Sequence, residues 1–228
     1  MSYNRRGGYD MNDAVRQKKE RGIWDRIAAC YDARMLRQFA SAYERAPEKV
    51  LASVSQKQTL LDIGCGTGLI TLRIAPHVEH ITAIDLSPQM LAVARRKVEQ
   101  QGITNVDFQV ADGYSLPLDG RSFDAVLLFN ILHIVQNPGS LLQEAHRLLK
   151  PNGCVFSATD CYAEPVPWAI RMVLNAQKLM KLTGSVPFMR YYKKEDLDRL
   201  FERSSFLVED SDVLQAVPVN YYVRARKV

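Results

Sequence analysis

The chain has 228 residues, of which 47% are hydrophobic, and its formal net charge is +5 at pH 7. This length suits one domain with a modest insertion. No uninterrupted apolar run approaches the ~20 residues that a transmembrane helix needs. No secretory signal is visible, because no apolar segment follows Arg5 and Arg6. We therefore expect a globular cytoplasmic protein without stable membrane insertion.

The positive charge is concentrated at the two ends of the chain. Residues 1–26 carry seven Arg and Lys against four Asp and Glu, and the last five residues carry three basic groups and no acid. Proteins that bind nucleic acid usually present a basic stripe on the face that holds it. The distribution disfavours nucleic acid as a partner. The four cysteines form no C-x-x-C pair, which predicts neither a metal site nor a disulfide framework.

The N-terminal quarter is predicted to be helical. Residues 1–12 are polar, and we expect them to be disordered or to order only over a bound ligand. A helical pattern begins at Asp13, and a second helix is predicted over residues 35–46, ending before Pro47.

Residues 60–75 read as a strand, a glycine turn and a helix. Gly64, Gly66 and Gly68 permit backbone conformations that other residues avoid, and they let backbone N–H groups approach a ligand closely. Asp85 closes the next apolar run, where a nucleotide fold places its ribose-binding acid. The spacing G-x-G-x-G, with Asp62 two residues before it, differs from the G-x-G-x-x-G of dinucleotide sites. A carboxylate there suits a ligand with an ammonium group rather than a phosphate.

Alternating strands and helices follow. Ser87, Pro88 and Gly102 bound a helix over residues 88–101. Strands are predicted over residues 103–110, 122–129 and 154–159, with a helix from Pro138 and a turn at residues 151–153 before the last of them.

The C-terminal part begins with an amphipathic helix over residues 166–182, which Gly184 ends. An aromatic loop leads to a helix over residues 194–203. Two strands over residues 206–213 and 217–226 form an antiparallel hairpin with its turn at residues 214–216.

Residues 61–68 (LDIGCGTG) resemble the first motif of the class I S-adenosylmethionine (SAM)-dependent methyltransferases. The resemblance continues in order through later segments and covers roughly the middle 100 residues. The subgroup that the chain resembles includes the ubiquinone/menaquinone-type and other small-molecule methyltransferases. These later segments are residues 85–91 (DLSPQML), 109–117 (QVADGYSLP), 122–126 (SFDAV) and 144–153 (EAHRLLKPNG).

The resemblance implies an α/β fold: a Rossmann-like, doubly wound, seven-stranded sheet, mostly parallel, with a C-terminal antiparallel hairpin and helices on both faces. Residues 51–228 would form the SAM-binding domain, residues 1–50 would cover the cofactor site, and a lid at about residues 160–192 would cover the acceptor. The cofactor would be SAM and the product S-adenosylhomocysteine (SAH). In-line displacement at the sulfonium methyl would need alignment above all and no dedicated catalytic residue.

The resemblance also assigns site residues. The glycine loop would cradle SAM, with Asp62 near its amino end and Asp85 on the ribose hydroxyls. Asp112 would accept from the adenine amine, and Asn130 would line the passage to the acceptor. Tyr31 is a candidate contact to the methionine end, or else an aromatic that packs the N-terminal helix. The candidate cofactor residues are Tyr31, Asp62, Gly64, Cys65, Gly66, Gly68, Asp85, Leu86, Met90, Ala111, Asp112, Gly113 and Asn130.

Residues 130–133 (NILH) indicate which kind of acceptor the protein would methylate. Methyltransferases that modify base amines typically carry Asn/Asp-Pro-Pro and an aromatic residue there, and this chain does not. His133 could act as the base for a hydroxyl, thiol or amine, or it could pack beneath the cofactor. An aromatic, Met-containing lid suits a small apolar or planar acceptor. The basic face of the lid helix could alternatively rest on a membrane if the acceptor is a lipid.

Two other functions remain open on the sequence. A nicotinamide-dependent oxidoreductase would share the strand-end acid, but the glycine spacing, Asp62 and the lack of a Tyr-x-x-x-Lys pair disfavour it. A non-catalytic SAM-binding protein would carry the same cofactor motifs. The atom that is methylated, and the choice between monomer and homodimer, also stay open.

Overall fold

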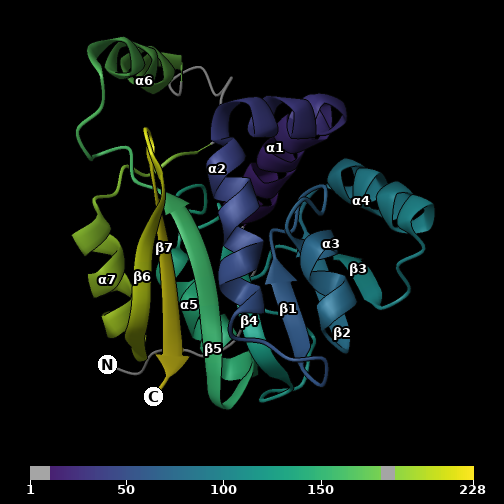
Figure 1. Cartoon of the computed structure of the whole chain (residues 1–228). Helices are drawn as coiled ribbons and strands as arrows, with labels where there is room; N and C mark the ends of the chain where they lie inside the picture. The colour runs from purple at the N-terminus through teal and green to yellow at the C-terminus, as the bar shows by residue number, and fades with distance from the viewer. Residues whose placement is uncertain (1–10, 181–187) are drawn as a thin grey trace.

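The computed structural model describes residues 11–180 and 188–228, which form a seven-stranded sheet flanked by helices (Figure 1). The strand order is β3-β2-β1-β4-β5-β7-β6; β1 to β5 run parallel, and β7 pairs antiparallel with both β5 and β6. This is the fold class expected from the sequence. The strands are β1 Thr59–Ile63, β2 His80–Asp85, β3 Val106–Val110, β4 Phe123–Phe129, β5 Leu149–Asp160, β6 Phe206–Ala216 and β7 Val219–Lys227.

The helices lie on both faces of the sheet and at the edge where the parallel strands end (Figure 1). They are α1 Met11–Ile27, α2 Tyr31–Leu51, α3 Thr71–Ile74, α4 Pro88–Gln101, α5 Pro138–Leu148, α6 Trp168–Met180 and α7 Lys194–Arg203, with 3-10 turns η1 Ala28–Cys30 and η2 Ala75–His77. None of the described helices is long and apolar enough to cross a membrane.

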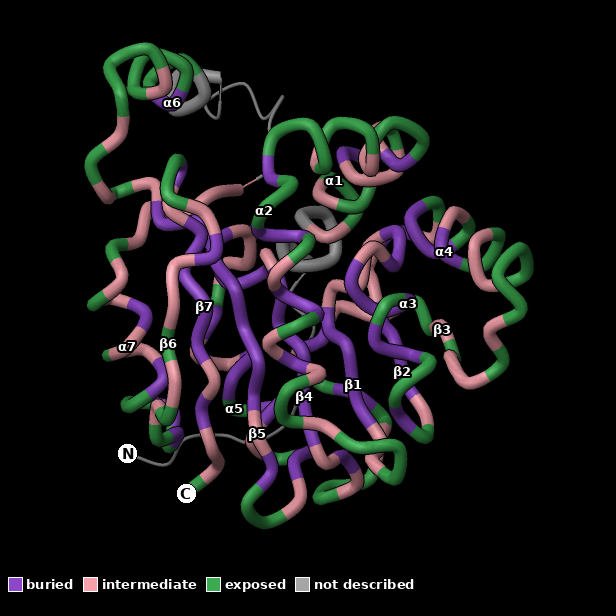
Figure 2. The backbone as a smooth tube through the Cα atoms, viewed as in Figure 1, coloured by how far each residue is buried: buried purple, intermediate pink, exposed green. Residues whose placement is uncertain are grey.

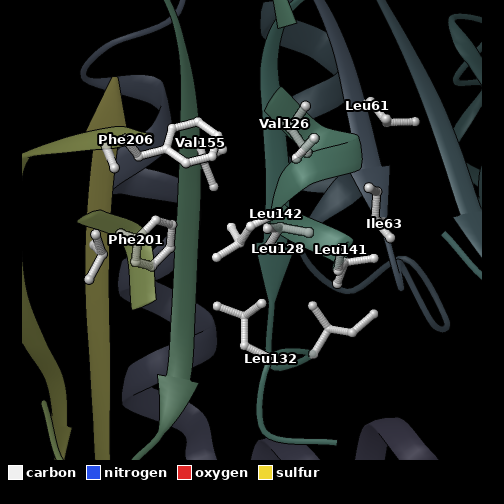
Figure 3. Packing of buried hydrophobic residues seen from close by; sticks show 14 of the residues in the cluster. Leu61, Ile63, Val126, Leu128, Leu132, Leu141, Leu142, Val155, Phe201 and Phe206 are labelled. Atoms are coloured by element: carbon white, nitrogen blue, oxygen red, sulfur yellow. The ribbon is translucent and has the colours of Figure 1, made fainter. Parts of the chain in front are cut away.

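Successive residues of the central strands are buried on opposite faces of the sheet, because side chains alternate along a strand. In β1, Leu61 and Ile63 belong to the cluster that contains residues of α5 and α7, whereas Leu60 belongs to the cluster that contains residues of α2 and η2. The tube in Figure 2 is buried along most of β1, β4 and β5. Figure 3 shows the first of these two clusters, in which Leu141 and Leu142 of α5 and Phe201 of α7 cover the strands. Burial on both faces explains why these strands are continuous apolar runs.

The helix predicted over residues 35–46 is longer than expected. It runs from Tyr31 to Leu51 with Pro47 inside it, and Phe39 has non-helical dihedral angles that mark a kink. Proline removes a hydrogen bond to the carbonyl four residues earlier. Here Arg73 Nη1 donates to that carbonyl, Tyr43 O, at 2.8 Å. The prediction of an end before Pro47 was wrong because a partner thirty residues away satisfies the carbonyl.

The hairpin turn was also misplaced. Pairing continues to Ala216 and Val219, so the turn lies at Val217 and Pro218 rather than at residues 214–216. Leu214 is 1% exposed in the cluster that contains α2, and Ser41 Oγ donates to its carbonyl at 2.7 Å. These contacts keep the predicted turn residues in the strand.

Smaller differences concern other boundaries. The helix after the glycine loop has only four residues before a 3-10 turn that contains Pro76, and β3 begins at Val106 instead of residue 103. The turn predicted at residues 151–153 is an irregularity inside β5, where pairing jumps from Phe123↔Leu149 to Ala125↔Cys154. The helices at residues 88–101 and 194–203 are confirmed. Gly184 and the end of the helix predicted over residues 166–182 lie outside the described residues.

The carboxylate of Asp124, at the start of β4, contributes to the stability of the fold in a way that can be tested. Its carboxylate accepts from Lys150 Nζ and from the Thr59 N–H, each at 2.9 Å. Partial burial alone would raise the pKa of Asp124, but these hydrogen bonds outweigh it and lower the pKa. The carboxylate therefore stabilises the fold above the pKa it has when unfolded, and this contribution is lost as the pH falls through its folded pKa.

We predict that Asp124→Asn lowers the free energy of unfolding at pH 7 by about 1 kcal/mol, because a partly exposed ion pair is screened by solvent. Urea denaturation at pH 7 and at about pH 3 measures this, and the difference from wild type should shrink at the lower pH. Glu99→Gln, which changes an exposed acid on α4, is the control and should change little. A difference that is equally large at both pH values would contradict the prediction.

Candidate functional site

A cavity of about 520 Å³ opens at the carboxyl ends of the parallel strands. The strand order reverses at β1, which lies between β2 and β4, and open α/β sheets bind ligands at such a reversal. Residues at the ends of β1 to β3 form one part of the wall, which we call the β1–β3 side: Gly64, Gly66, Asp85, Leu86, Met90, Ala111 and Asp112. The β4–β5 side comprises Asn130, His133, Asp160, Tyr162, Met189 and Tyr191, and helices α1 and α2 contribute further residues.

Asp85 ends β2 and is fixed by two backbone donors. Its Oδ2 accepts from Gly66 N–H at 2.9 Å and its Oδ1 from Ser87 N–H at 2.8 Å. Burial raises the pKa of Asp85 to about 6, and these hydrogen bonds oppose that rise. The carboxylate thus joins the glycine loop to the start of α4, where Ser87 caps the helix by accepting from Met90 N–H.

The glycine loop does not offer its N–H groups to a ligand in the way the sequence suggested. Gly64 N–H donates to Ile84 O, Gly66 N–H to Asp85 and Gly68 N–H to Cys65 O. The glycines that line the cavity, Gly64 and Gly66, instead present backbone without a side chain. A Cβ on Gly66, whose φ is +56°, would have its nearest neighbour, Tyr31 Cε1, at 4.0 Å. A larger side chain there would extend into the cavity without meeting the core.

Four of the predicted cofactor residues do not line the cavity: Asp62, Cys65, Gly68 and Gly113. Asp62 is 3% exposed, and its Oδ2 accepts from Thr71 Oγ at 2.6 Å. Burial raises the pKa of Asp62 to about 7, although the Thr71 hydrogen bond lowers it. Burial also raises the pKa of the Cys65 thiol, which agrees with a small residue packed between glycines rather than a reactive thiol.

Helix α1 lies over the β1–β3 side. Gln17 Nε2 donates to Asp112 Oδ2 at 2.6 Å, and Asp25 Oδ1 accepts from Ser87 Oγ at 2.6 Å and from Gln89 N–H at 3.3 Å. At the start of α2, Asp32 forms an ion pair with Lys97 of α4. The N-terminal helices are therefore tied by polar contacts to the loop and helix that carry the wall.

Tyr31 lines the cavity beside Tyr43. The two hydroxyls are 3.2 Å apart, and the Tyr43 hydroxyl also hydrogen bonds with the Asn130 side chain. Asn130, directly after β4, has φ +55°, a left-handed conformation that places it on the wall. Asn220 Nδ2 of β7 donates to Asn130 Oδ1 at 2.9 Å.

His133 and Asp160 occupy the same side of the cavity, each 5% exposed. His133 Nε2 is 3.9 Å from Asp160 Oδ2, and the carboxylate also accepts from Tyr162 Oη at 3.0 Å and Asn220 Nδ2 at 2.8 Å. Burial lowers the pKa of His133, and the charge of Asp160 opposes this. The described residues include no group of three His, Cys, Asp or Glu that could hold a metal ion.

Sequence reasoning missed Tyr43, Asp160, Tyr162 and Asn220. Asp160 had a usable signal, because it ends a parallel strand as Asp85 does. Asn220 had none, since it lies sixty residues from Asp160 and reaches it only through the antiparallel pairing of β5 with β7.

Comparison with known proteins identifies the class. Residues 61–157 match the sequence profile of the family described as "Methyltransferase domain". A demethylmenaquinone methyltransferase from Tropheryma whipplei is 32% identical over 188 residues, which cover 80% of this chain and 77% of that protein. A ubiquinone biosynthesis O-methyltransferase from Aeromonas salmonicida is 28% identical over 71% of this chain and 68% of its own length.

A solved structure shares the fold at lower identity. The geranyl diphosphate C-methyltransferase from Streptomyces coelicolor, in complex with Mg²⁺, geranyl diphosphate and SAH, aligns with a TM-score of 0.67 and 14% identity over 85% of this chain and 81% of that one. Together with the strand order and the motifs, these comparisons place the chain in the class I SAM-dependent methyltransferases. It is an enzyme of that class.

The glycine loop generates a prediction about ligand binding. Gly66→Val should abolish SAM binding, because the side chain would enter the cavity, while the protein stays folded. Gly102→Val is the matched control: Gly102 also has positive φ and open space, but it lies at the C-terminus of α4 outside the cavity wall. Each variant should carry a similar backbone cost of about 1–2 kcal/mol.

Calorimetry with SAM and thermal unfolding of both variants test this prediction. Unchanged SAM affinity in Gly66→Val would remove the glycine loop from the binding site.

Proposed function

We propose that the chain binds SAM on the β1–β3 side of the cavity and transfers its methyl group to a small-molecule acceptor held on the β4–β5 side. The observation that carries this proposal is one continuous cavity that has Asp85 and Asp112 on one side and, on the other, aromatic and Met side chains beside a small group of polar residues. Methyl transfer by in-line displacement requires the two ligands to be aligned, and a shared cavity provides that proximity.

Each expected cofactor residue on the β1–β3 side has a proposed role in binding SAM. Asp85, already fixed by two N–H donors, would accept from the ribose hydroxyls, and Leu86 and Met90 would lie beside the adenine. Asp112 would accept from the adenine amine in place of Gln17. Ala111 lines this part of the wall, and Gly113 follows Asp112 in the turn behind it.

The methionine end of SAM carries two positive groups, the ammonium and the sulfonium. Asp62 would attract the ammonium from behind Gly64, and a nearby cation would favour the ionised form of this carboxyl, whose pKa burial raises to about 7. Cys65 and Gly68 would act only by shaping the loop. Tyr31 and Asn130 would lie between the methionine end and the acceptor.

The acceptor side favours a small, largely apolar molecule. Tyr162 and Tyr191 stack edge to face, and Met189 and Ile134 add apolar surface. The relatives named for demethylmenaquinone and ubiquinone biosynthesis are consistent with a small acceptor. These comparisons favour neither a nicotinamide-dependent oxidoreductase nor a non-catalytic SAM-binding protein.

We further propose that the described part of residues 1–50, from Met11 onward, forms the cover over the cofactor that the resemblance implied; residues 1–10 lie outside the described residues. Support comes from the contacts of Gln17, Asp25 and Asp32 with the wall and with α4. Loss of one such contact should let the bound cofactor escape faster.

Asp25→Ala removes the hydrogen bonds to Ser87 and Gln89. We predict an SAH affinity weaker by about 3- to 10-fold, the equivalent of one net hydrogen bond, mainly through faster dissociation measured by stopped flow. Glu99→Ala, an exposed acid on α4, should leave both values unchanged. Equal dissociation rates in Asp25→Ala and wild type would argue against a cover.

The decisive experiment for the function is parallel calorimetric titration with SAM, SAH and NADH. We expect SAM and SAH to bind at one site and NADH not to bind. Binding of NADH alone would overturn the proposal. Transfer of a tritiated methyl group from SAM to a panel of hydroxylated aromatic compounds then separates an enzyme with a small acceptor from a SAM-binding protein without turnover.

A further inference from the structure

A chain of hydrogen-bonded side chains runs from α2 to the end of β5. It begins at Tyr31, which lies beside the glycine loop, and continues to Tyr43, whose hydroxyl is 3.2 Å from that of Tyr31 and also hydrogen bonds with the Asn130 side chain. Asn220 Nδ2 then donates to Asn130 Oδ1 at 2.9 Å and to Asp160 Oδ1 at 2.8 Å. The chain therefore joins the wall beside the glycine loop to a carboxylate on the β4–β5 side.

Asp160 is the one member of this chain of side chains that is an acid. It lines the cavity, and its side chain is largely buried, since the residue is 5% exposed. Its Oδ1 accepts from Asn220 and its Oδ2 accepts from Tyr162 Oη at 3.0 Å. Both donors are neutral, so they stabilise the negative charge without cancelling it. A buried carboxylate is costly unless a positive charge also compensates it.

The protein supplies no such positive charge close to Asp160. No Lys or Arg in the described part of the chain forms an ion pair with it, and Arg34, which also lines the cavity, is exposed on α2. His133 Nε2 is 3.9 Å from Asp160 Oδ2, which is too far for a hydrogen bond. Burial lowers the pKa of His133, although the charge of Asp160 opposes this, so the ring is neutral at pH 7. A cationic ligand in the cavity would compensate Asp160.

The sulfonium of SAM is expected in this region. Burial and the neighbouring Tyr43 raise the pKa of Tyr31, and the negative charges of Asp85 and Asp160 raise it further, which places Tyr31 within the electrostatic reach of both carboxylates. The sulfonium joins the ribose to the methionine chain. A cofactor with its ribose at Asp85 and its methionine end beside Tyr31 therefore carries its sulfonium between Asp85 and Asp160.

We propose that Asp160 recognises the positive charge of the SAM sulfonium, so that the site distinguishes SAM from its neutral product SAH. The inference rests on the proposed function and deepens it by naming a residue that selects the cofactor over the product.

Methyl transfer removes the charge that Asp160 attracts. A lone pair of the acceptor forms the bond to the methyl carbon while the carbon–sulfur bond breaks, and the electron pair of that bond stays on sulfur. The positive charge passes to the methylated acceptor, and an acceptor that carried a proton becomes neutral by releasing it to water. SAH thus lacks an attraction that SAM has, and its release is favoured.

Asp160→Asn tests the charge with little change in shape. The amide oxygen can still accept from Asn220, and the amide nitrogen can donate to Tyr162 Oη in place of the bond seen here. Two unit charges a few ångström apart attract one another strongly enough, at an effective dielectric constant of about 20, to change an affinity about tenfold or more. We expect SAM to bind about tenfold more weakly to Asp160→Asn and SAH to bind with nearly unchanged affinity.

The measurement is calorimetric titration of the full chain with SAM, SAH and sinefungin. Sinefungin carries an ammonium group where SAM has its methylsulfonium, so it separates the effect of the charge from that of the methyl group. Its affinity should fall in Asp160→Asn as that of SAM does. The matched control is Asp198→Asn, which changes a carboxylate that accepts from Tyr221 Oη at 3.0 Å and does not line the cavity. It should leave all three affinities unchanged.

Two further variants separate the charge from the structure around it. Asp160→Ser also removes the charge, and it replaces Asp160→Asn if thermal unfolding shows that the latter is not folded. Tyr162→Phe removes a donor to Asp160 but keeps the negative charge. The ratio of SAM affinity to SAH affinity should fall in the first variant and stay close to that of wild type in the second.

The outcomes distinguish this inference from the proposed function. An unchanged ratio of SAM to SAH affinity in the folded variants without the charge overturns the role of Asp160. An equal loss for all three ligands, or a loss for SAM that sinefungin does not share, overturns it as well. If wild type binds none of the three ligands, the proposed function itself is wrong.

Discussion

The reversal of strand order at β1 is the constraint on which the rest of the structure depends. β1 is hydrogen bonded to β2 on one side and to β4 on the other. After β1 the chain continues to β2 and β3 at one edge of the sheet, and after β4 it continues to β5 toward the other edge. The loops that follow these strands therefore diverge and leave a crevice at their carboxyl ends. Gly64, Asp85 and Asn130, at or directly after the ends of β1, β2 and β4, line this crevice.

The charges placed around the crevice favour a cationic ligand. Asp62 and Asp85 lie close to one another behind and beside the glycine loop, and burial raises the pKa of both, to about 7 and about 6. A nearby positive charge stabilises the ionised form of such buried carboxylates. The N–H groups of Gly64, Gly66 and Gly68, which serve as anion donors in phosphate-binding loops, are used within the protein. Beside the glycine loop, a phosphate would meet two acids and N–H groups that are already in use, whereas an ammonium or a sulfonium would be attracted by the two carboxylates.

The two sides of the cavity are built in different ways. The β1–β3 side is formed by short-range features, namely a glycine loop, a capped helix and strand-end acids. The β4–β5 side depends on long-range contacts, above all the hydrogen bonds of Asn220 with Asp160 and Asn130. The β1–β3 side is thus encoded locally, while the β4–β5 side depends on how β7 pairs with β5.

The sequence by itself determined the elements whose signals are local. Ser87, Pro88 and Gly102 predicted α4 at its observed bounds, and the order of Asp62, the glycines and Asp85 predicted the location of the cavity wall. Only the tertiary structure decided the features that depend on distant partners. Arg73 lets α2 continue through Pro47, and contacts from α2 keep Leu214 in a strand. Burial placed Asp62 behind the wall, and Asn220 of β7 joined Asn130 to Asp160 on the opposite side of the cavity. Caps and turns involve neighbours along the chain and can be read there, whereas the partner of a buried polar group is known only once the chain has folded.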